Sequence, residues 1–242
     1  MRQVITLSLL VVFLLSCKKD TQKQDQLTLV ASFPVIIPEC SGLCEYVDNL
    51  FLTVSDSLSK VYAIDKQGTI MDSLTYEGQN LEGVTYVSVS GHIFIVEENT
   101  NEVVELDSLG NELNRFSIQV NNLIVKHGLE GITFDNVSNR LFLVSEKAPG
   151  LLIETSMAGA ELSRHELSFA EDYSSIYFDH VLNKLWILSD DSGTLTCCDL
   201  NGNPEKTWLT NIKKGEGLVV DSPNNQIYII SDKASQLFVF SI

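Results

Sequence analysis

One segment of the sequence recurs, with the same order of residue types, at several places along the chain. In residues 128–146, GLEGITFDNVSNRLFLVSE, a Gly-Leu-Glu-Gly motif precedes a short apolar strand, a polar turn, a second apolar strand and Ser-Glu. The third motif position is occupied in turn by Ser41, Glu82, Glu130, Ser174 and Glu216, at a spacing of roughly 40 to 48 residues, a period typical of solenoids and propellers. The repeat therefore limits the fold before any local propensity is considered.

Each repeat continues with two more apolar or alternating segments, separated by a turn that contains glycine in most copies. We expect third strands at 61–65, 103–107, 151–155 and 195–199, and fourth strands at 69–76, 112–118, 161–168 and 204–209. Four strands in such a repeat make one blade of a β-propeller. Helices are not expected, because turn residues interrupt the chain too often for helical periodicity. The sequence predicts an all-β fold, a five-bladed β-propeller with four-stranded antiparallel blades.

The two ends of the repeat array are complementary. Residues 236–242, QLFVFSI, match a third strand, after which the fifth repeat has no fourth. Residues 27–33, LTLVASF, form an apolar segment that precedes the first repeat. We expect this N-terminal strand to complete the last blade and close the ring, since closure removes a free sheet edge.

The first residues have the features of an export signal. Arg2 precedes an apolar stretch too short to span a bilayer, and 14–17, LLSC, resembles the lipobox of bacterial lipoproteins. This predicts a signal peptide over 1–16, a lipidated Cys17 with a polar tether over 17–26, and a propeller over 27–242. By the same resemblance, Lys18 favours sorting to the outer membrane. An ordinary secretory signal is the alternative.

Charge and cysteine content restrict the partners. The formal net charge of −16 disfavours nucleic acid, because an acidic surface repels phosphate backbones. We expect a monomer that contacts the membrane through its lipid and binds an unidentified protein or small molecule. Cys40 and Cys44 are spaced so that a disulfide is possible, whereas the adjacent Cys197 and Cys198 on one strand point to opposite faces. Buried free thiols are the simpler interpretation.

The repeat positions place acidic residues around one end of the propeller axis. The first strand of each blade lines the channel, so the motif residues form an inner ring of Ser41, Glu82, Glu130, Ser174 and Glu216. The residues at the ends of the second strands form an outer ring of Asp56, Glu98, Glu146, Asp190 and Asp232. Crowded carboxylates must raise their pKa values or bind a cation, and oxygen ligands of this kind suit Ca²⁺. The alternative is that these side chains cap strand ends and bond to neighbouring blades.

Other candidates for chemistry are weaker. Among the four histidines, His127 lies nearest the inner ring, although a solvated loop residue is the simpler interpretation. No Gly-x-Ser-x-Gly, phosphate-binding loop or His-Glu-x-x-His motif is present, so nucleophilic catalysis is not supported. Trp186 and Trp208 fall on predicted strands, where packing between blades is more common than a sugar-stacking surface.

The motifs and the lipobox together resemble the SdiA-regulated family, bacterial five-bladed propellers distantly similar to NHL-repeat and TolB-like proteins. The most similar pieces are 41–43 (SGL), 80–84 (NLEGV), 128–132 (GLEGI) and 215–218 (GEGL). The resemblance implies a propeller with bound calcium and no settled activity. The fourth repeat departs from the pattern, because 173–176, YSSI, lacks both Glu and Gly.

These observations leave three candidate functions, two of which require a bound ligand or substrate. The first is a lipid-anchored, Ca²⁺-binding interaction module of the cell envelope. The second is a metal-dependent hydrolase similar to lactonase or phosphoesterase propellers, in which Glu82, Glu130 and Glu216 hold the metal and His127 or Glu146 serves as acid or base. A scaffold without a small-molecule site is the third.

Overall fold

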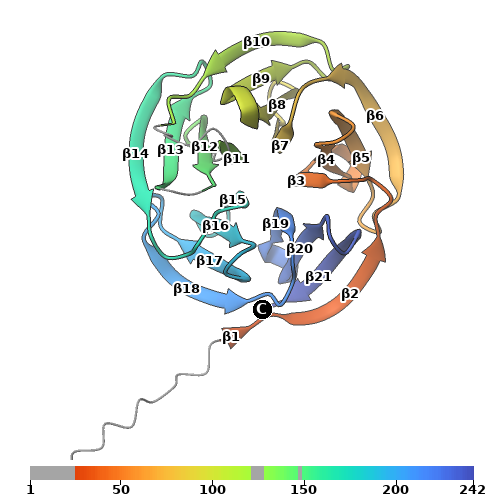
Figure 1. Ribbon diagram of the computed structural model, residues 1–242, viewed down its shortest axis with the longest axis vertical. Coiled ribbons are helices and arrows are strands. Elements are labelled where there is room, and N and C mark those ends of the chain that lie inside the picture. Colours follow the sequence, from red (N-terminus) through yellow and green to blue (C-terminus); the bar gives the residue numbers. More distant parts are fainter. Residues whose placement is uncertain (1–24, 121–127, 147–148) are drawn as a thin grey trace, which may run out of the picture.

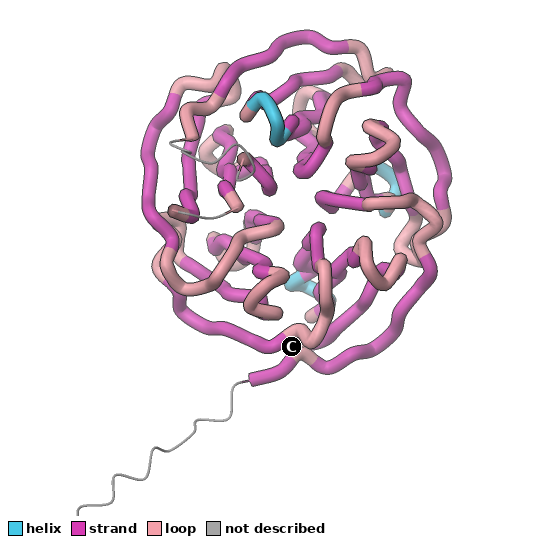
Figure 2. Tube along the Cα trace, in the orientation of Figure 1, coloured by secondary structure: helices cyan, strands magenta, loops and turns pink. Residues whose placement is uncertain are grey.

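The computed structural model describes residues 25–120, 128–146 and 149–242. Its strands form separate sheets arranged around a central axis (Figure 1). Short 3₁₀ turns, η1 (Val47–Asn49), η2 (Glu98–Thr100) and η3 (Ser222–Asn224), are the helical elements of the described part (Figure 2). None of them is long or apolar enough to cross a membrane. The arrangement confirms the predicted five-bladed propeller.

Each blade is an antiparallel sheet whose first strand lies nearest the axis. Blade one contains β3 (Cys40–Glu45), β4 (Phe51–Ser55), β5 (Lys60–Ile64) and β6 (Ile70–Glu77). Blade two contains β7 (Leu81–Val87), β8 (His92–Glu97), β9 (Glu102–Leu106) and β10 (Glu112–Ser117). Blade three contains β11 (Leu129–Asp135), β12 (Arg140–Ser145), β13 (Gly150–Ser156) and β14 (Glu161–Leu167). Blade four contains β15 (Ser175–Asp179), β16 (Lys184–Ser189), β17 (Thr194–Cys198) and β18 (Pro204–Leu209).

The fifth blade is built from both ends of the described chain. It contains β19 (Gly215–Asp221), β20 (Gln226–Ser231) and β21 (Gln236–Ser241), and its outer strand is β2 (Thr28–Pro34). The pairing of β2 with β21 is antiparallel and runs from Thr28 opposite Ser241 to Pro34 opposite Gln236. The predicted closure of the ring by the N-terminal strand is therefore confirmed.

A short strand precedes the closing strand and was not predicted. β1 (Asp25–Gln26) pairs in parallel with β18 and gives blade four a fifth strand. The ammonium of Lys206 lies 3.0 Å from the carboxylate of Asp25, and the N–H of Leu27 donates to the carbonyl of Leu209. Regular structure is thus present within the segment assigned to the polar tether, and β1 with Leu27 joins blade four to the closing strand of blade five.

Burial follows the position of each strand in its blade. The second strands are buried along almost their whole length, because neighbouring blades cover both of their faces, whereas the outer strand β6 is mostly exposed. The buried apolar side chains pack in the layers between blades. Cys197 and Cys198 belong to different layers, as expected for adjacent residues of one strand.

The glycine of the repeated motif allows the first strands to approach one another at the axis. A Cβ atom at Gly83 would lie 2.7 Å from the carbonyl oxygen of Glu130, and one at Gly42 would lie 2.9 Å from that of Glu82. At Gly217 the same atom would lie 2.6 Å from the carbonyl carbon of Gly42. Glycine is required where two backbones come this close, and this approach sets the positions of the inner-ring residues.

Candidate functional site: an acidic pocket at one mouth of the axis

Carboxylates gather in a pocket at the end of the axis where the first strands begin. The pocket has a volume of about 200 Å³. We call it the acidic mouth, and it is lined by Glu82, Glu98, Glu130, Glu146, Asp172, Ser174, Asp190, Lys214 and Glu216. Both rings identified in the sequence contribute to it, while Ser41, Asp56 and Asp232 are not among its lining residues.

A repeated main-chain hydrogen bond brings the two rings together. In four blades the N–H of the outer-ring residue donates to the carbonyl of the residue two positions before the inner-ring residue, at 3.0–3.2 Å. These pairs are Asp56 with Glu39, Glu98 with Asn80, Glu146 with Gly128, and Asp232 with Lys214. The bond ties the end of the second strand to the start of the first strand in the same blade.

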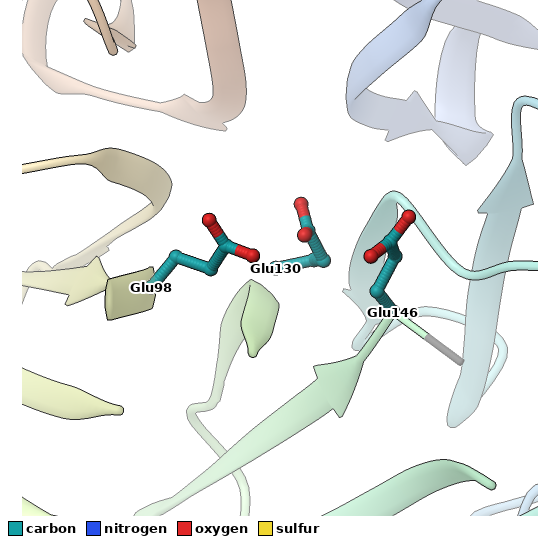
Figure 3. Close-up of side chains that lie close together, drawn as sticks. All are labelled: Glu98, Glu130 and Glu146. Atoms are coloured by element: carbon teal, nitrogen blue, oxygen red, sulfur yellow. The ribbon is translucent and has the colours of Figure 1, made fainter. Parts of the chain in front are cut away.

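Glu98, Glu130 and Glu146 form one of two close groups of carboxylates among the described residues, the other being Asp172, Asp190 and Asp191. One oxygen of each lies within 4.8 Å of those of the other two, and Figure 3 shows their side chains converging. Glu130 is only 9% exposed. Glu98 is held in place by Asn80, whose Nδ2 donates to Oε2 at 2.7 Å, and by the N–H of Gly128, which donates to Oε1 at 3.4 Å. The group therefore joins blades two and three.

Burial and mutual repulsion disfavour ionisation of these carboxyl groups. Burial, reinforced by the carboxylates of Glu82 and Glu98, raises the pKa of Glu130 well above its usual range. Burial raises the pKa of Glu82 to about 8 and that of Glu216 to about 7, although Lys214 lowers the latter. Without a cation, the acidic mouth therefore retains protons near neutral pH.

Among the described residues, one basic side chain lines the acidic mouth, and it lies beside blade five. The Nζ atom of Lys214 is 3.5 Å from Oε1 of Glu216 and 3.7 Å from Oδ2 of Asp190. The N–H of Lys214 also donates to Oδ1 of Asp190. Lys214 thus places a positive charge beside carboxylates of blades four and five. Among the described residues its ion pairs are with Glu216 and Asp190 and not with the group around Glu130.

Sequence reasoning missed both Lys214 and Asp172. They occupy the repeat position two residues before the inner ring, which holds Glu39, Asn80, Gly128, Asp172 and Lys214. Asp172 accepts hydrogen bonds from the hydroxyl of Ser189 and, at 3.0 Å, from the N–H of Asp191. Since these five residues share no chemical type, the repeat position can be identified only by counting residues from the motif.

The two inner-ring serines bond to the backbone of the following blade. The hydroxyl of Ser41 donates to the carbonyl of Glu82 at 2.7 Å, and that of Ser174 donates to the carbonyl of Gly215 at 2.7 Å. These bonds give both hydroxyls a structural role between blades. Of the residues outside the pocket, Asp56 affects it through charge, because its carboxylate raises the pKa of Glu82 further.

The remaining sequence candidates lie elsewhere. His127 falls outside the described residues. The rings of Trp186 and Trp208 are buried and stacked, with centroids 5.3 Å apart, which favours packing over sugar binding. Cys40, Cys44, Cys197 and Cys198 are buried free thiols, and burial raises the pKa of Cys40 to about 12. None of these four is a reactive nucleophile.

The fold and this site define a β-propeller with an acidic pocket on its axis. The chain belongs to the SdiA-regulated family, whose model matches residues 26–241, in agreement with the resemblance carried by the motifs. No match is found among curated proteins.

Solved structures share the fold at low sequence identity. A chain of a nidogen/laminin complex aligns with a TM-score of 0.61 and 15% identity, over 84% of this chain and 75% of that chain. Virginiamycin B lyase from Staphylococcus aureus aligns with a TM-score of 0.55 and 15% identity, over 83% of this chain and 65% of the lyase. A catalytically inactive form of that lyase with quinupristin also aligns, with a TM-score of 0.55 and 15% identity, over 84% of this chain and 66% of that one. At this identity the likeness shows the fold alone.

Proposed function

We propose that the protein is a lipid-anchored module of the bacterial envelope that binds Ca²⁺ at the acidic mouth and uses that face to bind a protein or small-molecule partner. The observation that carries the proposal is the convergence of Glu98, Glu130 and Glu146, with oxygens within 4.8 Å of one another. The formation of such a group around a buried carboxylate is costly unless a cation compensates it.

The donor set fits calcium. Ca²⁺ binds oxygen ligands at about 2.3–2.6 Å, so two ligands of one ion lie at most about 5 Å apart. The three carboxylates meet this limit. The described residues that line the acidic mouth offer carboxylates, one hydroxyl and one ammonium, a set of donors that suits calcium better than zinc. When bound, Ca²⁺ supplies the positive charge that lets Glu130 ionise within the fold. Of the other predicted ligands, Glu82, Glu216 and Ser174 line the same pocket, whereas Ser41 is not among its lining residues.

The anchor is proposed from the sequence. The lipobox at 14–17 makes Cys17 the lipidated residue, and Lys18 favours the outer membrane. Between Cys17 and the first strand at Asp25, a fully extended tether would reach roughly 25 Å. A Cys17→Ser variant should leave the membrane fraction, and a variant that stays membrane-bound would contradict lipidation at this residue.

A thermal-melt series tests the metal. The protein from residue 18 is stripped with chelator and titrated with Ca²⁺. An ion that binds only the folded state raises the melting temperature according to RT ln(1 + [Ca²⁺]/Kd). We expect a saturable increase that the triple variant of Glu98, Glu130 and Glu146 to Gln abolishes.

The matched control is Glu166→Gln. Glu166 is an exposed carboxylate on the outer strand β14 of blade three, the blade that supplies Glu130 and Glu146. This variant should respond to Ca²⁺ as the parent protein does. A parent protein without any Ca²⁺-dependent increase, or a triple variant with the parental increase, would rule out calcium at this group.

One observation favours the hydrolase as a second candidate. The pKa of Glu216, about 7, is suited to a general acid or base near neutral pH. A panel of lactones and phosphoesters, assayed with Ca²⁺ and with chelator, tests this activity. Turnover that requires Ca²⁺ and is lost in Glu216→Gln would support the hydrolase, whereas turnover that survives chelation would exclude a metal mechanism.

A further inference from the structure

A second pocket lies at the opposite mouth of the axis, where the first strands end. It has a volume of about 380 Å³, within the size range of small-molecule sites. Its walls come from the ends of β3, β7, β11 and β15 in blades one to four, and blade five contributes no lining residue. We call it the aromatic pocket, because Tyr46, Tyr86, Phe134, Tyr177 and Phe178 line it.

One hydrogen bond across the axis limits the pocket on the side of blade five. The hydroxyl of Tyr177, from blade four, donates to Oε2 of Glu45, from blade one, at 3.2 Å. Tyr177 is buried, whereas Glu45 is exposed. The bond fixes one oxygen of the Glu45 carboxylate beside the pocket, and the other oxygen makes no hydrogen bond to a described residue.

The aromatic wall formed by blades one and two is also ordered by a specific contact. The rings of Tyr46 and Tyr86 pack edge to face, with centroids 4.8 Å apart and an interplanar angle of 79°. Both side chains are partly exposed and line the pocket. An edge-to-face pair holds each ring in a defined orientation without covering it fully. A ligand in the pocket therefore meets preformed aromatic surface.

The charge of the pocket is negative. Among the described residues that line it, Glu45 is the only acidic one and His180 is the only basic one. The protein as a whole has a formal net charge of −16, which raises the local concentration of cations and opposes anions. An anionic ligand would find no positive partner here except a protonated His180.

We propose that the aromatic pocket binds a small organic cation, an ammonium group attached to an apolar body. Aromatic rings attract ammonium groups through their quadrupoles, and Glu45 supplies a charge-assisted acceptor for the same group. The apolar body packs against the side chains contributed by blades two and three. The proposal is independent of calcium, because the two pockets lie at opposite mouths of the axis.

Isothermal titration with three compounds of similar shape tests the proposal. The probes are 2-phenylethylammonium, the neutral 2-phenylethanol and the anionic 3-phenylpropanoate. We expect saturable one-site binding of the ammonium, at least tenfold tighter than that of the alcohol, and none of the anion. Absence of saturable ammonium binding, or equal affinity for ammonium and alcohol, would overturn the proposal.

Two variants locate the binding site. Glu45→Gln keeps an acceptor for the hydroxyl of Tyr177 but removes the charge, and should weaken ammonium binding about tenfold. Tyr46→Leu removes an aromatic ring and should weaken it severalfold. The control is Glu77→Gln. Glu77 is an exposed carboxylate on β6 of the same blade and pairs with Lys60, so this variant should leave the affinity unchanged. Circular dichroism verifies that each variant is folded, and parental affinity in Glu45→Gln would overturn the proposal.

Calcium distinguishes the two mouths. The titration is run in excess Ca²⁺ and in chelator, and we expect dissociation constants that agree within about twofold. A tenfold loss of ammonium affinity in Ca²⁺ would place the amine at the acidic mouth and overturn the proposal. A melting temperature that does not respond to Ca²⁺, together with parental ammonium binding, would contradict the calcium site alone.

Discussion

A Cβ atom added to Gly83 would lie 2.7 Å from the carbonyl oxygen of Glu130 in the next blade. Gly83 also follows Glu82 directly in the chain. Its close approach to the backbone of Glu130 therefore sets the positions of two carboxylates, one on blade two and one on blade three. Its first effect is on packing, because main-chain atoms at this distance cannot accept a methyl group without moving apart. We expect Gly83→Ala to lower the free energy of unfolding by about 1–3 kcal/mol, measured by urea denaturation.

A glycine in open space provides the control for this prediction. A Cβ atom at Gly91 meets nothing within 4 Å, although its φ of +73° requires a residue that tolerates the left-handed region. Asn is such a residue, so Gly91→Asn should change stability far less than Gly83→Ala. Equal losses in the two variants would show that close packing at the axis does not require the glycine.

Much of the fold was predictable, because the repeat length indicated four-stranded blades and the incomplete last repeat indicated how the ring closes. The missing fourth strand of the last repeat and the surplus strand before the first repeat could satisfy each other, and β2 pairs with β21 as expected. The strand at Asp25 was not predictable in this way. It consists of two polar residues and depends on its pairing with Trp208 and Leu209 of β18, which lie far away in the sequence.

The acidic mouth was predictable as a region but not as a set of contacts. Repeat positions placed Glu130 at the axis and Glu98 and Glu146 farther out, whereas the structure groups these three together. Which side chains meet depends on their conformations and on the residues beside them, which a repeat alignment does not contain. The ion pair of Lys214 with Glu216 has no counterpart in the other repeats, because none of them has a basic residue at the position of Lys214.

The raised pKa values predict how the calcium-free protein responds to pH. Glu82 and Glu216 have ordinary pKa values of 4.5, raised in the fold to about 8 and about 7. The folded state therefore keeps these protons at pH values where the unfolded chain has lost them. The contribution of the two protonated carboxyl groups to the free energy of unfolding is fully present below about pH 4.5 and is lost as the pH rises toward 8. In chelator, the free energy of unfolding should therefore fall between pH 5 and pH 8.

A double variant, Glu82→Gln with Glu216→Gln, isolates this contribution. Gln remains uncharged, so the fall in unfolding free energy over the same pH range should be smaller, while Glu166→Gln should keep the parental slope. Urea denaturation at several pH values measures both. A double variant with the parental slope would mean that these two carboxyl groups do not retain protons in the fold.

Charge removal at Lys214 should strengthen calcium binding. The ammonium lies 3.5 Å from Glu216 in the acidic mouth, where it repels a bound cation. At low ionic strength we expect Lys214→Gln to tighten Ca²⁺ binding roughly threefold, an effect that salt should reduce by screening. Titration calorimetry measures this, with Lys233→Gln as the control, since Lys233 is exposed in blade five and does not line the acidic mouth. Weaker Ca²⁺ binding in Lys214→Gln would contradict this electrostatic account.

Ring closure predicts a sharp boundary for N-terminal truncation. A variant that begins at Asp25 keeps β1 and β2 and should melt close to the full-length protein. A variant that begins at Val35 lacks β2. Its loss exposes the edge of β21 and removes the buried Leu27 and the packing of Phe33 against the core shared by blades four, five and one. An unpaired edge and an open blade leave the ring unclosed, so this variant should show no cooperative thermal transition by circular dichroism. A cooperative melt within a few degrees of the longer variant would show that the ring is stable without its closing strand.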